Sequence, residues 1–334
     1  MAMFTCQFKD HFFFGFGGIC LTKTVDLYTN NNFYTGLLLF LVLLWLPYLC
    51  SCSILQETKN MKQELFFFKY QGTGNDFVLL DNREGCFPAD DEALIRALCH
   101  RRFGVGADGL MLLEASNKQL FSMRYFNSDG RESSMCGNGG RCMVAFAFDL
   151  GLVDAGKPFS FEAIDGLHEA VYVPGAIRLK MVDVKEIKEM EGDCFLNTGS
   201  PHLVRFCAQA EQVDVPGLGR TLRNDPAYGK GGCNVNFVGR KAPGFLQVRT
   251  YERGVEEETW SCGTGCVAAV LSDHFLHGET AAYRVAVKGG ELQVSFVSPA
   301  KGRYSDIWLE GPARFVFRGS LDADALLKQS AYGF

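Results

Sequence analysis

The sequence predicts an α+β fold built from two halves of similar design. Short strand-like runs follow one another along most of the chain, and helix-like runs are few. This order differs from the steady alternation of strand and helix that predicts a doubly wound parallel sheet. In addition, residues 122–142 and 247–266 share one pattern: an Arg-containing strand-like run, an acidic connector, a Cys-Gly-x-Gly turn and an apolar helix-like run.

The bulk composition limits the classes of function. The 334 residues are enough for about two domains of ~150 residues each. A formal net charge of −5 argues against a nucleic acid as the main partner. The spacings of the 13 cysteines do not match a paired zinc site, and a chain of this size folds without a disulfide framework. We therefore expect mostly free thiols, a cytoplasmic location and no bound metal.

Residues 1–60 differ in composition from the rest of the chain. They contain Phe-rich and Asn-rich stretches and an apolar run at 36–46 that continues through Pro47. This run is shorter and more interrupted than a membrane-spanning helix of ~20 residues. It also lies too far along the chain for a signal peptide and has no small-residue cleavage site after it. We expect a disordered extension with no role at a membrane, and a globular part that starts at Met61.

The elements of the globular part are predicted in chain order. Strands at 65–70 and 76–80 flank a Gly-Thr-Gly-Asn turn, and residues 90–100 form a helix with Asp90 as its N-cap. Strands at 110–113 and 123–126 precede the first Cys-Gly-x-Gly turn and its helix. Further strands are expected at 159–163, 168–173, 177–181, 202–207, 234–238 and 245–251. The second Cys-Gly-x-Gly turn and helix follow, and then several strands up to Phe317.

Cys136 and Cys262 each stand directly before a predicted helix. The free N–H groups and the positive end of the helix dipole favour an anion at that place. We expect this position to lower the thiol pKa and make a thiolate available. The adjoining glycines let the backbone approach a ligand and direct N–H groups at a carboxylate. Facing each other, the two turns would hold a carboxylate-bearing carbon between two thiols.

Other motifs have simpler explanations. The stretch Gly-Val-Gly-Ala-Asp-Gly at 104–109 matches a dinucleotide fingerprint, but a helix precedes it and a strand follows, which is the reverse of the required order. Lys288 lies in a strand-turn-strand context, which does not favour a pyridoxal phosphate site. Cys142 and Cys266 fall inside the helices and are expected in the core.

Taken together, several stretches resemble the diaminopimelate epimerase family, from about residue 69 to 311. The most specific is Asn-x-Asp-Gly at 127–130 followed by Cys-Gly-Asn-Gly-x-Arg at 136–141. The others are Gly-Thr-Gly-Asn-Asp-Phe at 72–77, the 104–109 stretch, Pro-His at 201–202, Tyr-Glu-Arg-Gly at 251–254 and Cys-Gly-Thr-Gly at 262–265.

The resemblance implies two pseudo-symmetric domains, each a mostly antiparallel sheet wrapped around a central helix, with the active site in the cleft between them. We expect the domains at 61–180 and 181–312, with the tail 313–334 packing back on the first. The implied activity is interconversion of LL- and meso-2,6-diaminopimelate in lysine biosynthesis, with no cofactor or metal. A homodimer is a further possibility.

The resemblance also implies roles for individual residues. Cys136 and Cys262 would be the two acid/base thiols, one on each face of the α-carbon. His202 and Glu252 would adjust their pKa values. The remaining predicted contacts bind the substrate, either its reacting carboxylate or its distal end: Asn75, Asn127, Gly137, Asn138, Asn234, Glu252, Arg253, Gly263 and Thr264.

Some positions depart from the family pattern. Ser200 stands where many members have a substrate-binding Asn, and Gly109 stands where many have Gln. Arg131 replaces a usual Ser, and the connector before Cys262 is acidic at Glu256, Glu257 and Glu258. The departures at Ser200 and Gly109 leave the details of substrate binding open.

Three alternatives remain at this point. A proline racemase-like enzyme would need no pocket for a second amino-acid head group, and a phenazine-biosynthesis isomerase lacks the thiol pair. The third is a thiol redox or membrane-tethered binding protein that uses residues 36–55 as an anchor. It predicts that Cys136 and Cys262 pair with each other, or that activity needs a membrane.

Overall fold

The computed structural model describes residues 64–330. The chain divides into two units, Met1–Met61 and Lys62–Phe334, and the described residues belong to the second. The predictions for residues 1–60, including the apolar run and the start at Met61, lie outside the described residues. No helix in the described part of the chain is long and apolar enough to cross a membrane.

The first half contains ten elements. In chain order they are β1 (Glu64–Gly72), β2 (Asn75–Asp81), α2 (Glu92–Cys99), β3 (Gly109–Glu114), β4 (Ser122–Asn127), β5 (Glu132–Ser133), α3 (Gly137–Asp149), β6 (Pro158–Ala163), β7 (Gly166–Val173) and β8 (Ala176–Lys180).

The second half and the C-terminal segment follow. Their elements are β9 (Ile187–Met190), β10 (Asp193–Asn197), β11 (Pro201–Phe206), the 3-10 turn η2 (Ala210–Gln212), α4 (Val215–Arg223), the 3-10 turn η3 (Pro226–Tyr228), β12 (Asn234–Ala242), β13 (Phe245–Glu252), β14 (Glu257–Thr259), α5 (Gly263–His277), β15 (Ala282–Val287), β16 (Gly290–Ala300), β17 (Arg303–Gly311), β18 (Arg314–Asp322) and α6 (Ala323–Ser330).

Strand pairing repeats step by step between the halves. In the first half β1–β2 is antiparallel, β2–β3 parallel, β3–β4 and β4–β5 antiparallel, β4–β6 parallel, and β6–β7 and β7–β8 antiparallel. The pairs from β10–β11 to β16–β17 follow the same sequence of orientations. The predicted α+β fold of two pseudo-symmetric domains, each mostly antiparallel, is therefore confirmed.

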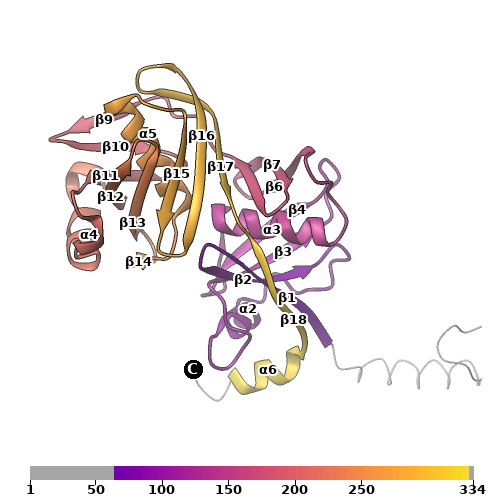
Figure 1. Ribbon diagram of the computed structural model, residues 1–334. Coiled ribbons are helices and arrows are strands. Elements are labelled where there is room, and N and C mark those ends of the chain that lie inside the picture. Colours follow the sequence, from indigo (N-terminus) through magenta and orange to yellow (C-terminus); the bar gives the residue numbers. More distant parts are fainter. Residues whose placement is uncertain (1–63, 331–334) are drawn as a thin grey trace, which may run out of the picture. The chain divides into compact units, whose positions relative to one another are not determined.

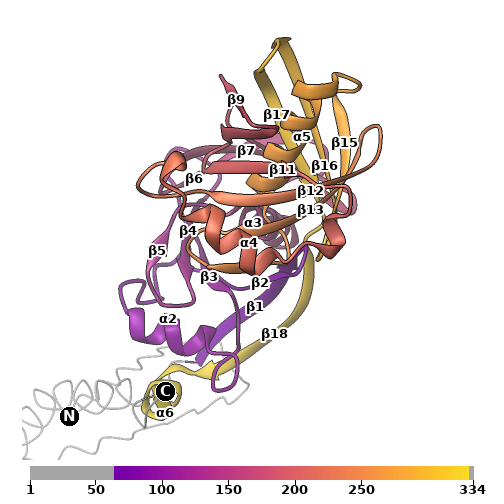
Figure 2. The ribbon, with the colours of Figure 1, turned by 90° about the vertical axis from the view of Figure 1, so that its left-hand side faces the viewer.

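Two further pairings connect distant parts of the chain. β8 pairs antiparallel with β17, which joins the two halves into one sheet. β18 pairs antiparallel with β1 along nearly its whole length, from Glu64↔Asp322 to Gln71↔Arg314. Figure 2 shows β18 running beside β1, with α6 next to α2. The C-terminal strand thus belongs to the sheet of the first half. The boundary near residue 180 stays a prediction.

A buried helix lies at the centre of each half. Figure 1 shows α3 and α5 surrounded by the strands of their own halves. All residues from Asn138 to Ala147 of α3 are buried, and α5 is buried nearly as far, through Asp273. A helix that is apolar on all sides is stable only inside a core. Cys142 and Cys266 are 0% exposed in these helices, as predicted for core positions.

Three helices differ from the sequence-based prediction, and one of them is α6 in the C-terminal tail, which was not predicted. The N-cap of α2 is Asp91 and not Asp90, because the Asp91 side chain accepts a hydrogen bond from the amide of Leu94. Helix α4 was not predicted. Its start carries the usual sequence features, an N-cap at Asp214 and a proline in the first turn.

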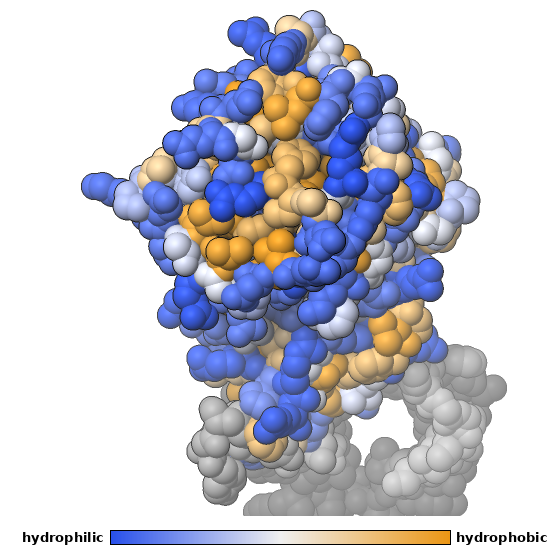
Figure 3. Space-filling model, turned by 60° about the vertical axis from the view of Figure 1, so that its left-hand side comes forward, coloured by the Kyte–Doolittle hydropathy of each residue, from blue (hydrophilic) through white to orange (hydrophobic). Residues whose placement is uncertain are grey.

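The surface is mainly hydrophilic. On the face drawn in Figure 3, hydrophilic residues surround smaller groups of hydrophobic ones. Among large hydrophobic side chains, three consecutive residues of β18 are about half exposed: Phe315 (48%), Val316 (52%) and Phe317 (44%).

Candidate active site

The N-terminal ends of α3 and α5 meet. A Cβ atom added to Gly137 would lie 3.9 Å from the Cα of Gly263, and one added to Gly263 would lie 3.8 Å from the Cα of Gly137. These are van der Waals distances, so the two helix ends approach each other closely. Leu309 of β17 packs over the junction, with its Cδ2 only 2.8 Å from the position of a Cβ on Gly263. The two helix N-termini therefore lie next to each other. Each has free N–H groups and a positive partial charge.

Asn138 connects the halves at this junction. Its Nδ2 donates a hydrogen bond of 2.8 Å to the carbonyl of Ser261 and another to Oδ1 of Asn75. Its Oδ1 accepts from the guanidinium of Arg141 at 2.9 Å. The sequence predicted contacts from the backbone amide of Asn138. The buried side chain, which ties Asn75 to the segment before Cys262, has a separate structural role.

Cys136 and Cys262 are the N-cap residues of α3 and α5. Cys262 is buried and Cys136 is partly buried, and both are free thiols. The Sγ of Cys262 lies 3.5 Å from Oγ1 of Thr264. The structure thus positions the two predicted thiols at the meeting helix ends.

The prediction that the helix ends lower the pKa values of the two thiols is wrong for this structure. Burial raises the pKa of Cys136, and the nearby Glu252 raises it further, against the lowering effects of the Gly139 and Asn138 amides and of Arg141. Burial and Glu252 likewise raise the pKa of Cys262, against the Thr264 hydroxyl and the Gly265 amide. Removing water from around a thiolate destabilises it by more than the hydrogen bonds and dipole of the helix N-terminus stabilise it. Both thiols are therefore protonated near neutral pH in this state.

Glu252, at the end of β13, acts on both thiols. Burial raises the pKa of the Glu252 carboxyl, the side chain of Thr259 lowers it, and Asp108 raises it. The role of Glu252 in adjusting the thiol pKa values stays a prediction.

Sequence reasoning assigned no role to Asp108, which acts on both Glu252 and Asn75. Its Oδ2 accepts a hydrogen bond of 2.9 Å from Nδ2 of Asn75, and its Oδ1 lies 2.6 Å from Nη2 of Arg101. The 104–109 stretch therefore orients Asn75. The Gly-Ala-Asp-Gly pattern in that stretch was visible in the sequence, but its partners were not.

A second cluster forms beside Glu252. Nδ2 of Asn234 donates to Oγ of Ser200 at 3.0 Å, and Oδ1 of Asn234 accepts from the amide of Arg253 at 2.8 Å. Nη2 of Arg253 donates to the same Ser200 hydroxyl at 3.2 Å. The guanidinium of Arg253 is exposed, and so it is free to bind an anion. This arrangement assembles donors suited to a polar head group.

His202 belongs to this second cluster. Its Nδ1 lies 3.1 Å from Nδ2 of Asn236, and its Nε2 lies 3.5 Å from Nδ2 of Asn234. The ring is fully buried, and burial with the charge of Arg253 lowers the pKa of His202 to about 3. His202 is therefore neutral at physiological pH. In the described part of the chain its hydrogen bonds run to these asparagines, so an effect on the thiols would be indirect.

Comparison with known proteins identifies the family. The diaminopimelate epimerase family model matches residues 67–178 and 194–316. A diaminopimelate epimerase of Flavobacterium psychrophilum is 47% identical over 257 residues, which are 76% of this chain and 99% of that protein. One of Chlorobaculum tepidum is 44% identical over 258 residues, 75% of this chain and 98% of that protein. The chain belongs to the diaminopimelate epimerase family.

Solved structures with the same fold are more distant. A phenazine biosynthesis protein of the PhzF family from Bacillus anthracis has a TM-score of 0.63 and 13% identity, covering 78% of this chain and 99% of that one. A probable proline racemase from Agrobacterium radiobacter has a TM-score of 0.57 and 15% identity, covering 77% and 92%. These two proteins therefore share the fold of this chain although their sequences differ widely.

One departure of this epimerase-family chain has a steric explanation. A Cβ at Gly109 would lie 2.5 Å from the carbonyl oxygen of Phe126 and 2.6 Å from Cε2 of Tyr125. The Tyr125 ring, which lies near Cys136, Glu252 and Asp108, takes the space that a longer side chain would need. Asn127, paired with Gly109 across the strands, is exposed at the end of β4.

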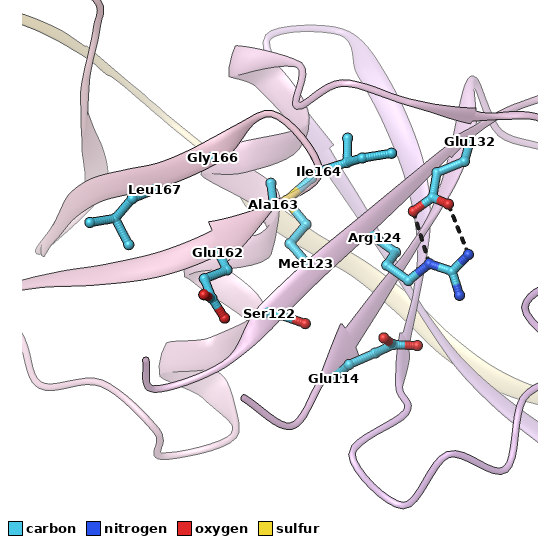
Figure 4. Close-up of a pocket in the computed structure, with 10 residues that line it drawn as sticks. All are labelled: Glu114, Ser122, Met123, Arg124, Glu132, Glu162, Ala163, Ile164, Gly166 and Leu167. Carbon is cyan, nitrogen blue, oxygen red and sulfur yellow. Dashed lines mark hydrogen bonds and ion pairs between the residues drawn. The ribbon is translucent and has the colours of Figure 1, made fainter. Parts of the chain in front are cut away.

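One surface groove lies away from the predicted site residues. It has a volume of about 510 Å³ and runs between β4 and the β6–β7 turn (Figure 4). In Figure 4 the ion pair of Arg124 with Glu132 lies on one side and the exposed Leu167 on the other. Ile164 is also exposed. None of the predicted site residues of this epimerase-family protein lines the groove, so we do not assign the groove to the active site. In residues 64–330, no three His, Cys, Asp or Glu side chains form a metal-binding group.

Proposed function

We propose that this protein is a diaminopimelate epimerase that interconverts LL- and meso-2,6-diaminopimelate through two cysteines. The observation that carries the proposal is the meeting of two Cys-capped helix ends at Gly137 and Gly263. The α-proton of an amino acid is very weakly acidic, so its removal requires charge stabilisation at the carboxylate. Two helix ends directed at one carboxylate supply this stabilisation where the negative charge develops.

The chemistry is a proton transfer in two directions. The thiolate of one cysteine removes the α-proton, which forms an S–H bond and leaves its electron pair on the substrate. The thiol of the other cysteine delivers a proton to the opposite face and becomes a thiolate. Because the reaction is reversible, Cys136 and Cys262 exchange the roles of base and acid. The amides at Gly137, Asn138, Gly263 and Thr264 hold the reacting carboxylate.

Substrate recognition at the distal end is assigned to the second cluster. Asn234 and Arg253 bind the distal carboxylate and amine together with Asn75, Asn127 and Glu252. A guanidinium suits a carboxylate because it donates two parallel hydrogen bonds. A proline racemase-like activity, the alternative, would leave these donors without a ligand. The fixed bonds of Asn234 to Ser200 and Arg253 support the epimerase.

The test is epimerisation in deuterated water by the purified full chain under reducing conditions. A protonated thiol exchanges with solvent, so new product carries deuterium at the α-carbon from the first turnover, while recovered substrate stays unlabelled. Cys136→Ala and Cys262→Ala should each abolish turnover. Cys142→Ala and Cys266→Ala should mainly lower stability, because these residues are buried in the helices. Protium retained in the product, or turnover of proline in place of diaminopimelate, would contradict the proposal.

We also propose a homodimer formed through β18. In the described part of the chain β18 pairs only with β1, so its other edge is open, and Phe315, Val316 and Phe317 are about half exposed. An open hydrophobic edge strand favours association with another chain. Phe315→Glu should shift the protein to a monomer in sedimentation velocity. Leu218→Glu, at a residue 48% exposed on α4, should not. A wild-type monomer would rule out the dimer.

We assign the enzyme to the cytoplasm. A thiol pair that works by proton transfer must stay reduced, which the cytoplasm ensures. The proposed activity belongs to lysine biosynthesis.

A further inference from the structure

Arg141 is a buried cation to which the proposed mechanism assigns no role. It lies in the second turn of α3 and is 0% exposed, the largest fully buried side chain in the described region. No ion pair joins its guanidinium to a carboxylate within residues 64–330. Its hydrogen-bond acceptors are all neutral: Oγ1 of Thr73 at 2.8 Å, Oδ1 of Asn138 at 2.9 Å, and the carbonyls of Gly137 and Pro312, both at 3.3 Å.

Two glycines make room for this guanidinium. A Cβ on Gly72 would lie 3.4 Å from Nη2 of Arg141, and a Cβ on Gly311 would lie 3.2 Å from Nε. Gly72 is in β1 and Gly311 is in β17, and these strands are more than a domain length apart in the sequence. The chain therefore closes around the guanidinium from both halves, and the charge is enclosed instead of reaching solvent.

An enclosed charge without a counter-ion is unfavourable. Arginine stays protonated at any physiological pH, so burial cannot be relieved by loss of the proton. An isolated buried ion is costly unless an opposite charge compensates it. In this structure the neutral acceptors solvate the guanidinium but leave its charge in place. The positive charge of the guanidinium therefore stabilises an anion that lies nearby.

The Arg141 charge would stabilise an anion at the junction of the α3 and α5 N-termini. Two of the acceptors of Arg141, the Gly137 carbonyl and the Asn138 side chain, belong to the first turn after Cys136. The positive charge lowers the pKa of Cys136, against burial and Glu252, and it also lowers the pKa of Cys142 and Cys266. The last two remain protonated inside the helices, since burial raises the pKa of Cys266 to about 12 and that of Cys142 further.

We propose that Arg141 is a positioning residue whose uncompensated charge, held behind the paired helix ends, favours an anion there. The anion is the Cys136 thiolate. The inference rests on the proposed function, which makes Cys136 a proton-transfer group. It explains why a buried arginine without a carboxylate partner belongs beside Cys136. Glu252 on β13, when ionised, opposes its effect on Cys136, and the neighbouring Tyr125 on β4 stays neutral because burial raises its pKa.

The test measures thiolate formation directly. The full chain is treated with iodoacetamide at a series of pH values, and modification of Cys136 is followed by peptide mass spectrometry. In Arg141→Met the midpoint of the rate profile should rise by about one pH unit, so that Cys136 reacts about tenfold more slowly below the midpoint. Arg141→Gln, which keeps polar atoms for Thr73 and Asn138, should show the same shift if the Met variant does not fold. Arg141→Lys keeps the charge and should retain most of the wild-type profile.

Arg205→Met is the matched control. Arg205 is an arginine with a carboxylate partner, Asp193, at 2.5 Å. Its loss should lower stability and leave the Cys136 profile unchanged. Wild-type profiles in both neutral variants would overturn the proposal and leave Arg141 a hydrogen-bonding clamp. A Lys variant that shifts as far as Met would also overturn it. The proposed function fails separately, if Cys136→Ala still epimerises diaminopimelate.

Discussion

The side chain of Asn138 donates a hydrogen bond of 2.8 Å to the carbonyl oxygen of Ser261, two residues before the N-terminus of α5. The bond crosses from the first half of the chain to the second. With the bond from Asn138 to Asn75, it aligns one Cys-capped helix end with the other and with a predicted substrate contact. The precision of the site depends on a buried amide that is not itself placed to transfer a proton.

We predict that Asn138→Ala lowers both stability and turnover. The substitution leaves the Ser261 carbonyl, the Asn75 amide and the Arg141 guanidinium short of a partner, so the free energy of unfolding should fall by roughly 2–3 kcal/mol. Urea denaturation and kcat/KM are the measurements. Asn127→Ala is the control for stability, because that side chain is exposed and should change the unfolding free energy by less than about 0.5 kcal/mol. Equal stabilities of the two variants would argue against the bridging role.

The helix junction predicts unequal effects for two equivalent glycines. A Cβ on Gly263 would lie 2.8 Å from Cδ2 of Leu309, whereas one on Gly137 would lie 3.6 Å from the same atom. Gly263→Ala should therefore destabilise by roughly 1–3 kcal/mol, the usual cost of overpacking, and Gly137→Ala by less. In a Leu309→Ala background, the cost of Gly263→Ala should largely disappear. A double-mutant cycle of unfolding free energies tests this coupling, and additive effects would exclude it.

Because His202 is buried in its neutral form, we predict that the free energy of unfolding falls in acid. Its pKa is about 3 in the folded chain and near 6.5 when unfolded, so the unfolded chain takes up the proton first as the pH falls. The contribution is complete above pH ~6.5 and is lost progressively toward pH ~3, up to roughly 5 kcal/mol. Unfolding free energies of wild type and His202→Gln between pH 3 and 7 should converge at low pH, because carboxylate effects are common to both. A constant difference across that range would mean that His202 does not titrate this way.

Arg253 predicts dependence on the distal head group. Arg253→Leu should lower kcat/KM for diaminopimelate by roughly 2–4 kcal/mol in transition-state binding, the range for loss of one partner of a charged pair. Ser200→Ala removes the two hydrogen bonds that the Ser200 hydroxyl accepts from Arg253 and Asn234 but keeps both donors, so it should cost less, about 0.5–1.5 kcal/mol. Steady-state kinetics on both variants measure the difference. Arg253→Leu with normal kinetics would remove Arg253 from the substrate site.

Much of this protein could be predicted from local sequence. The strand runs, the two Cys-Gly-x-Gly turns with their apolar helices, and the repeat of the whole pattern all lie within short windows. They follow from side-chain periodicity and from where glycine permits a turn. Cys142 and Cys266 could be assigned to the core on the same basis. Helix α4 was missed although its Asp-Val-Pro start is local, because glycines and charges weaken its helical pattern.

Only the tertiary structure decided how these pieces act on one another. The direct meeting of Gly137 with Gly263, and the enclosure of Arg141 without a carboxylate partner among residues 64–330, each join segments far apart in the chain. The thiol pKa values are the clearest case. A helix end lowers a thiol pKa and can be predicted from two or three residues. Burial and the charge of Glu252 raise it, and both depend on which distant side chains replace water around the sulfur.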